Sequence, residues 1–148
     1  MLRHGRPSWV DEHDPLFLTF CAKPRGVNHF AHPEAWKAIL AEAQHQESKG
    51  RWRLRLIVAM PDHIHLIASV PVSPGIDRVG WCFKRGVSLR LQTSWQVGFF
   101  DHRIRNADSL SEKWNYVLMN PVRANLVKAA ADWPYAYVRK GDSDAVVV

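Results

Sequence analysis

The sequence has few cysteines, no long apolar run and no internal repeat, and each absence removes a class of protein. The two cysteines, Cys21 and Cys82, lie far apart in apolar surroundings, which excludes a disulfide framework and predicts reduced, buried thiols. No apolar run reaches about 18 residues, so we expect no transmembrane helix and no membrane partner. The residues Met1-Leu2-Arg3 do not resemble a secretory signal, so we expect a cytoplasmic protein.

The composition is that of a globular protein. Of the 148 residues, 47% are hydrophobic and 23% charged, which is enough apolar material for one core. We expect a flexible N-terminal arm at residues 1–14, one folded domain at 15–140 and a short acidic tail at 141–148. The net charge of +6 is uneven, because residues 75–140 hold eleven lysines and arginines against five acidic residues. This surplus favours a polyanionic partner.

Hydrophobic periodicity and turn residues predict seven elements. They alternate so that the order is β-α-β-β-α-β-α, which is typical of an α+β, ferredoxin-like β-α-β-β-α-β sandwich with an appended C-terminal helix. Two helices would cover one face of the sheet, and the other face could stay open for a ligand. The predicted strands are 16–22, 52–59, 63–70 and 98–105, and the predicted helices are 33–49, 76–91 and 109–120.

Two histidines stand one residue apart in the apolar run that follows Met60-Pro61-Asp62. Because strand side chains alternate between faces, His63 and His65 point the same way, roughly 6.5–7 Å apart along the strand, while their neighbours point into a core. Two imidazoles on one face form part of a small metal site. A hydrogen-bonded structural pair is the alternative interpretation.

A metal site needs at least a third ligand. Mg²⁺ and Mn²⁺ accept oxygen atoms from amides and carboxylates. Zinc is less well supported because no cysteine lies near the pair, and the HExxH motif of zinc proteases is absent.

A second polar pair lies on the last predicted helix. Tyr116 and Asn120 are four residues apart, so both lie on one helix face. Pro121 would close the helix at this point. A half-buried tyrosine and a simple helix stop are the structural alternatives. The other tyrosines, Tyr135 and Tyr137, follow Trp133-Pro134, where aromatic residues more often cap a core.

These motifs resemble the HUH single-tyrosine transposases, and more closely the REP-associated tyrosine transposases, which are relatives of the IS200-type enzymes. The resemblance spans most of residues 16–137. It rests on Met60 to His65, Phe83-Lys84-Arg85, Trp95 to Arg105, Tyr116 with Asn120 to Val127, and Asp132 to Tyr135.

The resemblance implies a catalytic domain with the ferredoxin-like fold. It implies that Tyr116 attacks a phosphate of single-stranded DNA, forming a 5′-phosphotyrosine and a free 3′-hydroxyl. It also makes His63, His65 and Asn120 the ligands of a divalent metal, Mg²⁺ or Mn²⁺. The expected partner is single-stranded DNA, in particular REP-like hairpins, and both a monomer and a homodimer stay open.

Six cations of the basic half are candidates for DNA phosphate contacts, although a solvated surface would explain each of them equally well. A catalytically inactive ferredoxin-like module that binds single-stranded nucleic acid is the alternative function. An RNA-recognition domain of that kind would carry aromatic and basic residues on its central strands, where this chain has the two histidines. The six candidates are Lys84, Arg85, Arg90, Arg103, Arg105 and Arg123.

Overall fold

The computed structural model describes residues 14–141, so the predicted arm and acidic tail lie almost wholly outside the described residues. Within this range no helix is both long and apolar enough to span a membrane. Both cysteines are free, as predicted, but they are partly rather than fully buried. The elements are β1 (Leu16–Cys21), α1 (Pro33–Ser48), β2 (Arg53–Ala59), β3 (His63–Ser69), α2 (Ile76–Leu91), β4 (Phe100–Arg103), α3 (Ala107–Arg123), η1 (Ala130–Asp132) and β5 (Ala136–Val138).

The strands form one sheet in the order β4-β1-β3-β2-β5, and every neighbouring pair is antiparallel. Its first four strands have the ferredoxin-like arrangement that the element order predicts, so the α+β prediction is confirmed. The additional strand β5 pairs with β2. With three residues, it is too short to show a hydrophobic period in the sequence.

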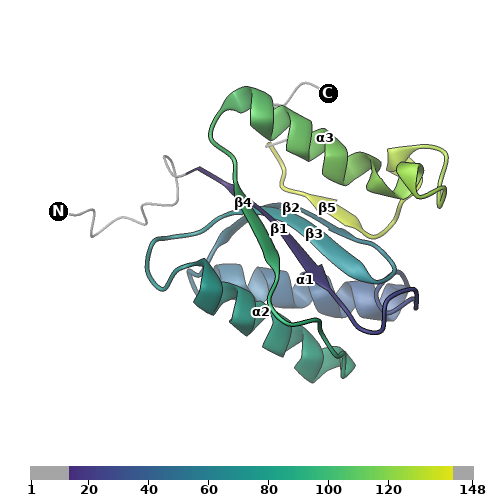
Figure 1. Ribbon diagram of the computed structural model, residues 1–148, viewed down its shortest axis with the longest axis horizontal. Helices are drawn as coiled ribbons and strands as arrows, with labels where there is room; N and C mark the ends of the chain where they lie inside the picture. The colour runs from purple at the N-terminus through teal and green to yellow at the C-terminus, as the bar shows by residue number, and fades with distance from the viewer. Residues whose placement is uncertain (1–13, 142–148) are drawn as a thin grey trace.

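The sheet is covered on both faces, which corrects the expectation that one face stays open. Helices α1 and α2 lie on one side and α3 on the other (Figure 1). The second face carries apolar side chains such as Val58 and Ile67, and α3 buries them under Trp114 and Val117. Apolar area that leaves water stabilises this contact, so the appended helix packs onto the sheet.

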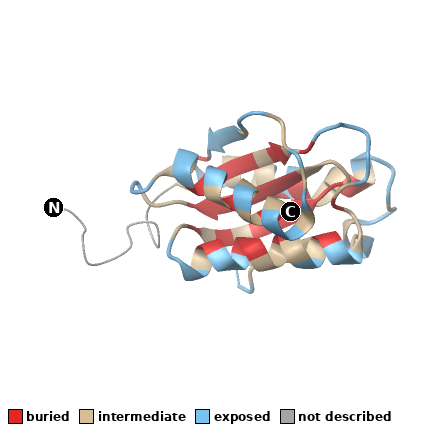
Figure 2. Ribbon diagram, turned by 90° about the horizontal axis from the view of Figure 1, so that it is seen from below, coloured by how far each residue is buried: buried red, intermediate tan, exposed pale blue. Residues whose placement is uncertain are grey.

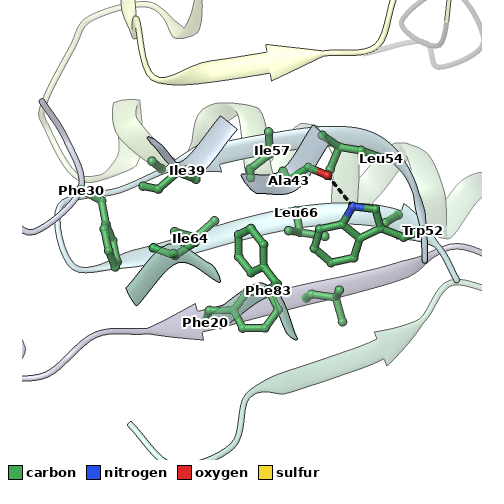
Figure 3. Packing of buried hydrophobic residues seen from close by; sticks show 14 of the residues in the cluster. Phe20, Phe30, Ile39, Ala43, Trp52, Leu54, Ile57, Ile64, Leu66 and Phe83 are labelled. Carbon is green, nitrogen blue, oxygen red and sulfur yellow. Dashed lines mark hydrogen bonds between the residues drawn. The ribbon is translucent and has the colours of Figure 1, made fainter. Parts of the chain in front are cut away.

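The core under α1 and α2 is dense and aromatic. The rings of Phe20 and Phe83 have centroids 5.0 Å apart, and Trp52 lies 5.2 Å from Phe83. Figure 3 shows these rings together with the hydrogen bond from the Trp52 indole N–H to the carbonyl of Ala43, which is 2.9 Å long. Figure 2 shows the buried residues concentrated on the central strands and the inner helix faces.

Helix α3 is longer than predicted at both ends. It begins after Asn106, whose side-chain oxygen accepts a hydrogen bond from the amide of Ser109 at 2.8 Å. It also continues through Pro121 to Arg123, so the prediction that Pro121 closes the helix is wrong. Proline removes one backbone hydrogen bond, but here the ring is buried against the rest of the fold and only the last turn follows.

Candidate active site

The two predicted histidines lie side by side on the face of β3 that α3 covers. Their ring centroids are 4.7 Å apart, while Ile64 and Leu66 are fully buried in the opposite core. The alternation of strand side chains therefore places the pair as predicted. His63 is partly accessible, and His65 is only 5% exposed.

Asp62 holds the first histidine. The Nδ1–H of His63 donates to the Asp62 carboxylate over 2.9 Å, because a carboxylate only accepts. The same carboxylate accepts from the Nε of Arg25 and from the amide of Gly26, each over 2.8 Å. Burial acts to raise the pKa of Asp62, but these hydrogen bonds and the charge of Arg25 outweigh it and lower the pKa well below its usual range. Asp62 is thus a fixed anion that sets the orientation of the His63 ring.

The second histidine is held by the neighbouring strand. Thr19 is paired in register with His65, and its hydroxyl is hydrogen-bonded to Nδ1 of His65 at 2.8 Å. Burial, the adjacent His63 and the charge of Arg123 lower the pKa of His65 to about 3. The ring is therefore neutral at neutral pH, which is the form that binds metals. With both Nδ1 atoms engaged, no described residue forms a hydrogen bond to either Nε2.

Tyr116 lies above this pair on α3, the helix that covers the same face of the sheet. Its ring centroid lies 5.8 Å from that of His65 and 6.0 Å from that of Phe17. The side chain is 44% exposed, so solvent or a substrate can reach the phenol. Trp114 and Val117, on the buried stripe of α3, anchor the helix and position the tyrosine above the histidines.

The helix places two further polar residues of the prediction near the tyrosine. Asn120 follows Tyr116 by one turn and is half-buried. The Arg123 guanidinium lies over the Tyr116 ring at 4.5 Å and donates a hydrogen bond to the Tyr116 carbonyl. Arg123 thus brings a positive charge beside both the tyrosine and His65.

The two imidazoles place two nitrogen donors on one face of β3, which is fewer than a divalent-cation site needs. Residues 14–141 contain no group of three or more His, Cys, Asp and Glu side chains that could hold a metal. A third protein ligand would therefore be an amide such as Asn120, and substrate oxygens would supply others.

The other predicted cations lie in different surroundings. Lys84 donates to the carbonyls of Gln96 and Gly98 over 2.9 and 2.8 Å, and burial lowers its pKa. Arg90 pairs with the buried Glu42 at 3.0 Å. Arg85 is exposed on α2, and Arg103 and Arg105 are exposed on and just after β4. Arg85, Arg103 and Arg105 are thus exposed candidates for contact with a polyanion, whereas Arg90 is exposed but already paired.

Several side chains around the pair were not singled out from the sequence. Thr19 contacts His65 through strand pairing, and Arg25 contacts Asp62 across a turn, so no local pattern reveals either of them. Lys113 was detectable, because it precedes Tyr116 by three residues and shares its helix face. Its ammonium lies 5.5 Å from the centroid of the Phe17 ring. Tyr135 and Tyr137 pack against the first core, as expected.

A groove lies beside β1, the strand that pairs with the histidine strand β3. It measures about 450 Å³ and lies between β1 and the segment that enters β4. Thr19 and Cys21 line it and are paired in register with His65 and His63. A linear substrate bound at the pair would therefore have a path along this edge of the sheet. The opposite wall is Gln96, Val97, Gly98, Phe99 and Phe100.

Fold and site together define a ferredoxin-like α+β protein in which a tyrosine helix covers a histidine pair. No family model matches the chain. It is similar to the REP-associated tyrosine transposase of Escherichia coli (strain K12), with 29% identity in an alignment of 85 residues that covers 53% of this chain and 50% of that protein. A protein of Haemophilus influenzae, named as a candidate of the same family, is 27% identical in an alignment of 97 residues that covers 54% of this chain and 55% of that protein.

A solved structure is similar to this chain in its fold. It is a REP-associated tyrosine transposase bound to a REP hairpin, and its TM-score is 0.77 at 19% identity, over 100% of this chain and 89% of that one. The chain is thus similar to REP-associated tyrosine transposases over about half of its length, which agrees with the resemblance drawn from the motifs. It spans about half the length of the curated relatives that it matches.

Proposed function

We propose that this protein cuts and rejoins single-stranded DNA through a covalent bond to Tyr116. One observation carries the proposal: the Tyr116 ring lies 5.8 Å from His65, whose ring lies 4.7 Å from His63. The fold thus brings the proposed nucleophile on α3 close to the proposed ligand pair on β3. A binding module without chemistry would not require this arrangement.

The reaction is a phosphoryl transfer in two balanced steps. The Tyr116 oxygen attacks a backbone phosphorus, the bond from phosphorus to the 3′-oxygen breaks, and the phenol proton is transferred so that a 3′-hydroxyl leaves. The 5′-phosphate remains on the tyrosine. In the reverse sense, a 3′-hydroxyl attacks the phosphotyrosine, the DNA bond re-forms and the phenol is restored.

The chain's own residues prepare this chemistry. His63, His65 and Asn120 would hold Mg²⁺ or Mn²⁺, which would neutralise charge on the phosphate and align it. Asp62 and Thr19 orient the two rings through Nδ1. Arg123, stacked over Tyr116, is positioned to stabilise negative charge that develops on the phosphate oxygens or on the phenolate.

We infer that the substrate is a hairpin with single-stranded flanks. The structural neighbour is bound to a REP hairpin, and residues 75–140 of this chain carry the basic surplus that a polyanion requires. Both a monomer and a homodimer are compatible with the family resemblance.

The test is formation of a covalent adduct. Labelled single-stranded hairpin DNA is incubated with the protein and Mn²⁺ or Mg²⁺, and the product is separated on a denaturing gel. Wild type should give a shifted, labelled protein band that EDTA prevents. Tyr116→Phe should give none.

Tyr137→Phe is the matched control, because Tyr137 packs against the opposite core, and it should form the adduct as wild type does. An adduct that survives in Tyr116→Phe would show that the nucleophile is wrong. A wild type that binds the hairpins but never becomes attached would favour the inactive binding module.

A further inference from the structure

We propose that α2 carries a stacking platform for one unpaired base of the single-stranded DNA, on the far side of the groove from the histidines. We call Trp81 and Arg85 the Trp81 platform. A second groove, separate from the one near the histidines, lies beside them. This inference rests on the proposed function, because it assumes that single-stranded DNA passes the site. It adds a subsite at a distance from the reacting phosphate.

The tryptophan of the platform is exposed although its helix has a well-formed buried face. Val79, Phe83 and Val87 turn one stripe of α2 into the core, whereas Trp81 is 56% exposed. The Arg85 guanidinium, one turn later, lies 5.6 Å from the centroid of its ring. This cation–π contact holds the indole in place and leaves apolar ring surface in water.

A groove of about 350 Å³ lies beside this ring, between α2 and the chain that leads to β4. Its volume is within the range of sites for small organic molecules. Aromatic rings and cations with no carboxylate in the lining are the combination that binds single strands, since bases stack on rings and cations meet phosphates. The lining residues are Trp81, Lys84, Arg85, Ser88 and Trp95.

The platform is connected to the candidate active site by one short segment. Lys84 lines this groove and donates to the carbonyls of Gln96 and Gly98, and residues 96–98 line the groove beside β1, so we call this segment the ridge between the two. Val97 at the ridge is fully exposed. A strand that leaves the histidine pair along the first groove would cross this ridge and reach Trp81.

The charge of the groove favours single-stranded DNA over a second copy of the chain. Trp95 is partly buried, and its indole N–H donates to the Lys84 carbonyl and to Ser88, so Trp81 is the ring of this groove left with a large exposed surface. One exposed ring between cations is a small apolar area for a protein interface. A duplex hairpin stem keeps its bases stacked, whereas an unpaired base can insert beside a ring.

The test measures binding without cleavage. A fluorescein-labelled oligo(dT) of about 12 nucleotides, within the site sizes typical of single-strand binders, is titrated with the full chain in EDTA and followed by anisotropy. Trp81→Ala should weaken binding by about 5- to 150-fold, the range for loss of one base–aromatic stack. Trp81→Phe should restore most of the affinity, and Arg85→Ala should lower the salt dependence by about one phosphate contact.

Val72→Ala is the matched control, because Val72 is 79% exposed and lies outside the groove. It should bind oligo(dT) as wild type does. Equal affinities of wild type and Trp81→Ala, with unchanged circular dichroism, would overturn the platform. A mass in light scattering that falls from dimer to monomer in Trp81→Ala would overturn it as well, and would make this face a contact between copies.

The adduct assay separates this inference from the proposed function. Loss of oligo(dT) binding in Trp81→Ala, without any Tyr116 adduct in wild type, would support the platform and contradict the proposed enzymatic activity. A Tyr116 adduct together with binding that does not depend on Trp81 would support the enzymatic activity and contradict the platform.

Discussion

The two faces of the sheet are built from the same strands but have different contents. The face under α1 and α2 holds a core of fully buried rings, among them Phe20, Trp52 and Phe83. The face under α3 combines a smaller apolar cluster with a histidine pair and a tyrosine that is 44% exposed. The first face therefore supplies most of the stability, and the second can accommodate polar groups whose partners are incomplete.

The largest expected effect comes from a change in the first face. Phe83→Ala should lower the free energy of unfolding by about 3–5 kcal/mol, because it leaves a cavity among closely packed rings. Urea denaturation measures it, with Leu89→Ala expected within about 0.5 kcal/mol of wild type. The amount of Tyr116 adduct per folded molecule should not change. A loss of adduct without a loss of stability would contradict the division between the two faces.

The second face should make stability depend on pH. The pKa of His65 is lowered from 6.5 to about 3 in the folded protein, so the unfolded chain binds more protons between these values. The stability that neutral His65 contributes is fully present above pH 6.5 and is lost as the pH falls toward 3. The slope is at most about 1.4 kcal/mol per pH unit.

Urea denaturation across that pH range measures the slope. His65→Gln should flatten the profile, whereas His102→Gln, at an exposed position of β4, should keep the wild-type slope. Equal slopes in wild type and His65→Gln would show that His65 is not held neutral by the fold.

A weaker effect is expected where Asp62 orients His63. Asp62→Asn removes the charge that fixes the Nδ1–H of this ring, and loss of such an outer partner lowers metal affinity by about 10- to 100-fold. Titration with Mn²⁺ by calorimetry measures the affinity directly. Asp101→Asn changes an exposed carboxylate on β4 and should bind Mn²⁺ as wild type does. An unchanged Mn²⁺ affinity in Asp62→Asn would show that Asp62 does not support metal binding.

The smallest effect is expected at the start of the tyrosine helix. Asn106→Ala removes the side-chain cap of α3 and should cost about 1 kcal/mol. Asn106→Asp keeps an acceptor and should retain the stability. Hydrogen exchange of the first turn of α3 is the local readout. If Asn106→Ala exchanges like wild type there, the cap does not limit fraying of this helix.

Much of the fold follows from local patterns. The spacing of Ala35, Ile39 and Ala43 places α1 in the correct range, and the alternation around His63 and His65 puts both rings on one face. The four-residue interval from Tyr116 to Asn120 needs only helical geometry. These inferences hold because each depends on a period within one element.

Other features had no local signal or were misread. The continuous apolar run of β3, with every residue from Ile64 to Ser69 buried, already indicates a strand that is covered on both faces. The prediction of an open sheet face did not take this apolar run into account. The sequence predicts a helix end at Pro121 because a proline inside a helix removes one backbone hydrogen bond. In the structure the proline ring is buried and the helix continues to Arg123.

The sequence alone predicted the groups of the candidate site: a histidine pair on one strand face, three tyrosines, one of them with an amide one turn later, and a basic second half. Tertiary structure decided which tyrosine lies above the pair, that Asp62 and Thr19 orient the rings, and that Arg123 stacks on Tyr116. The reason is that a side chain's direction follows from its own element, whereas its neighbours depend on how far-apart elements bury their apolar faces together.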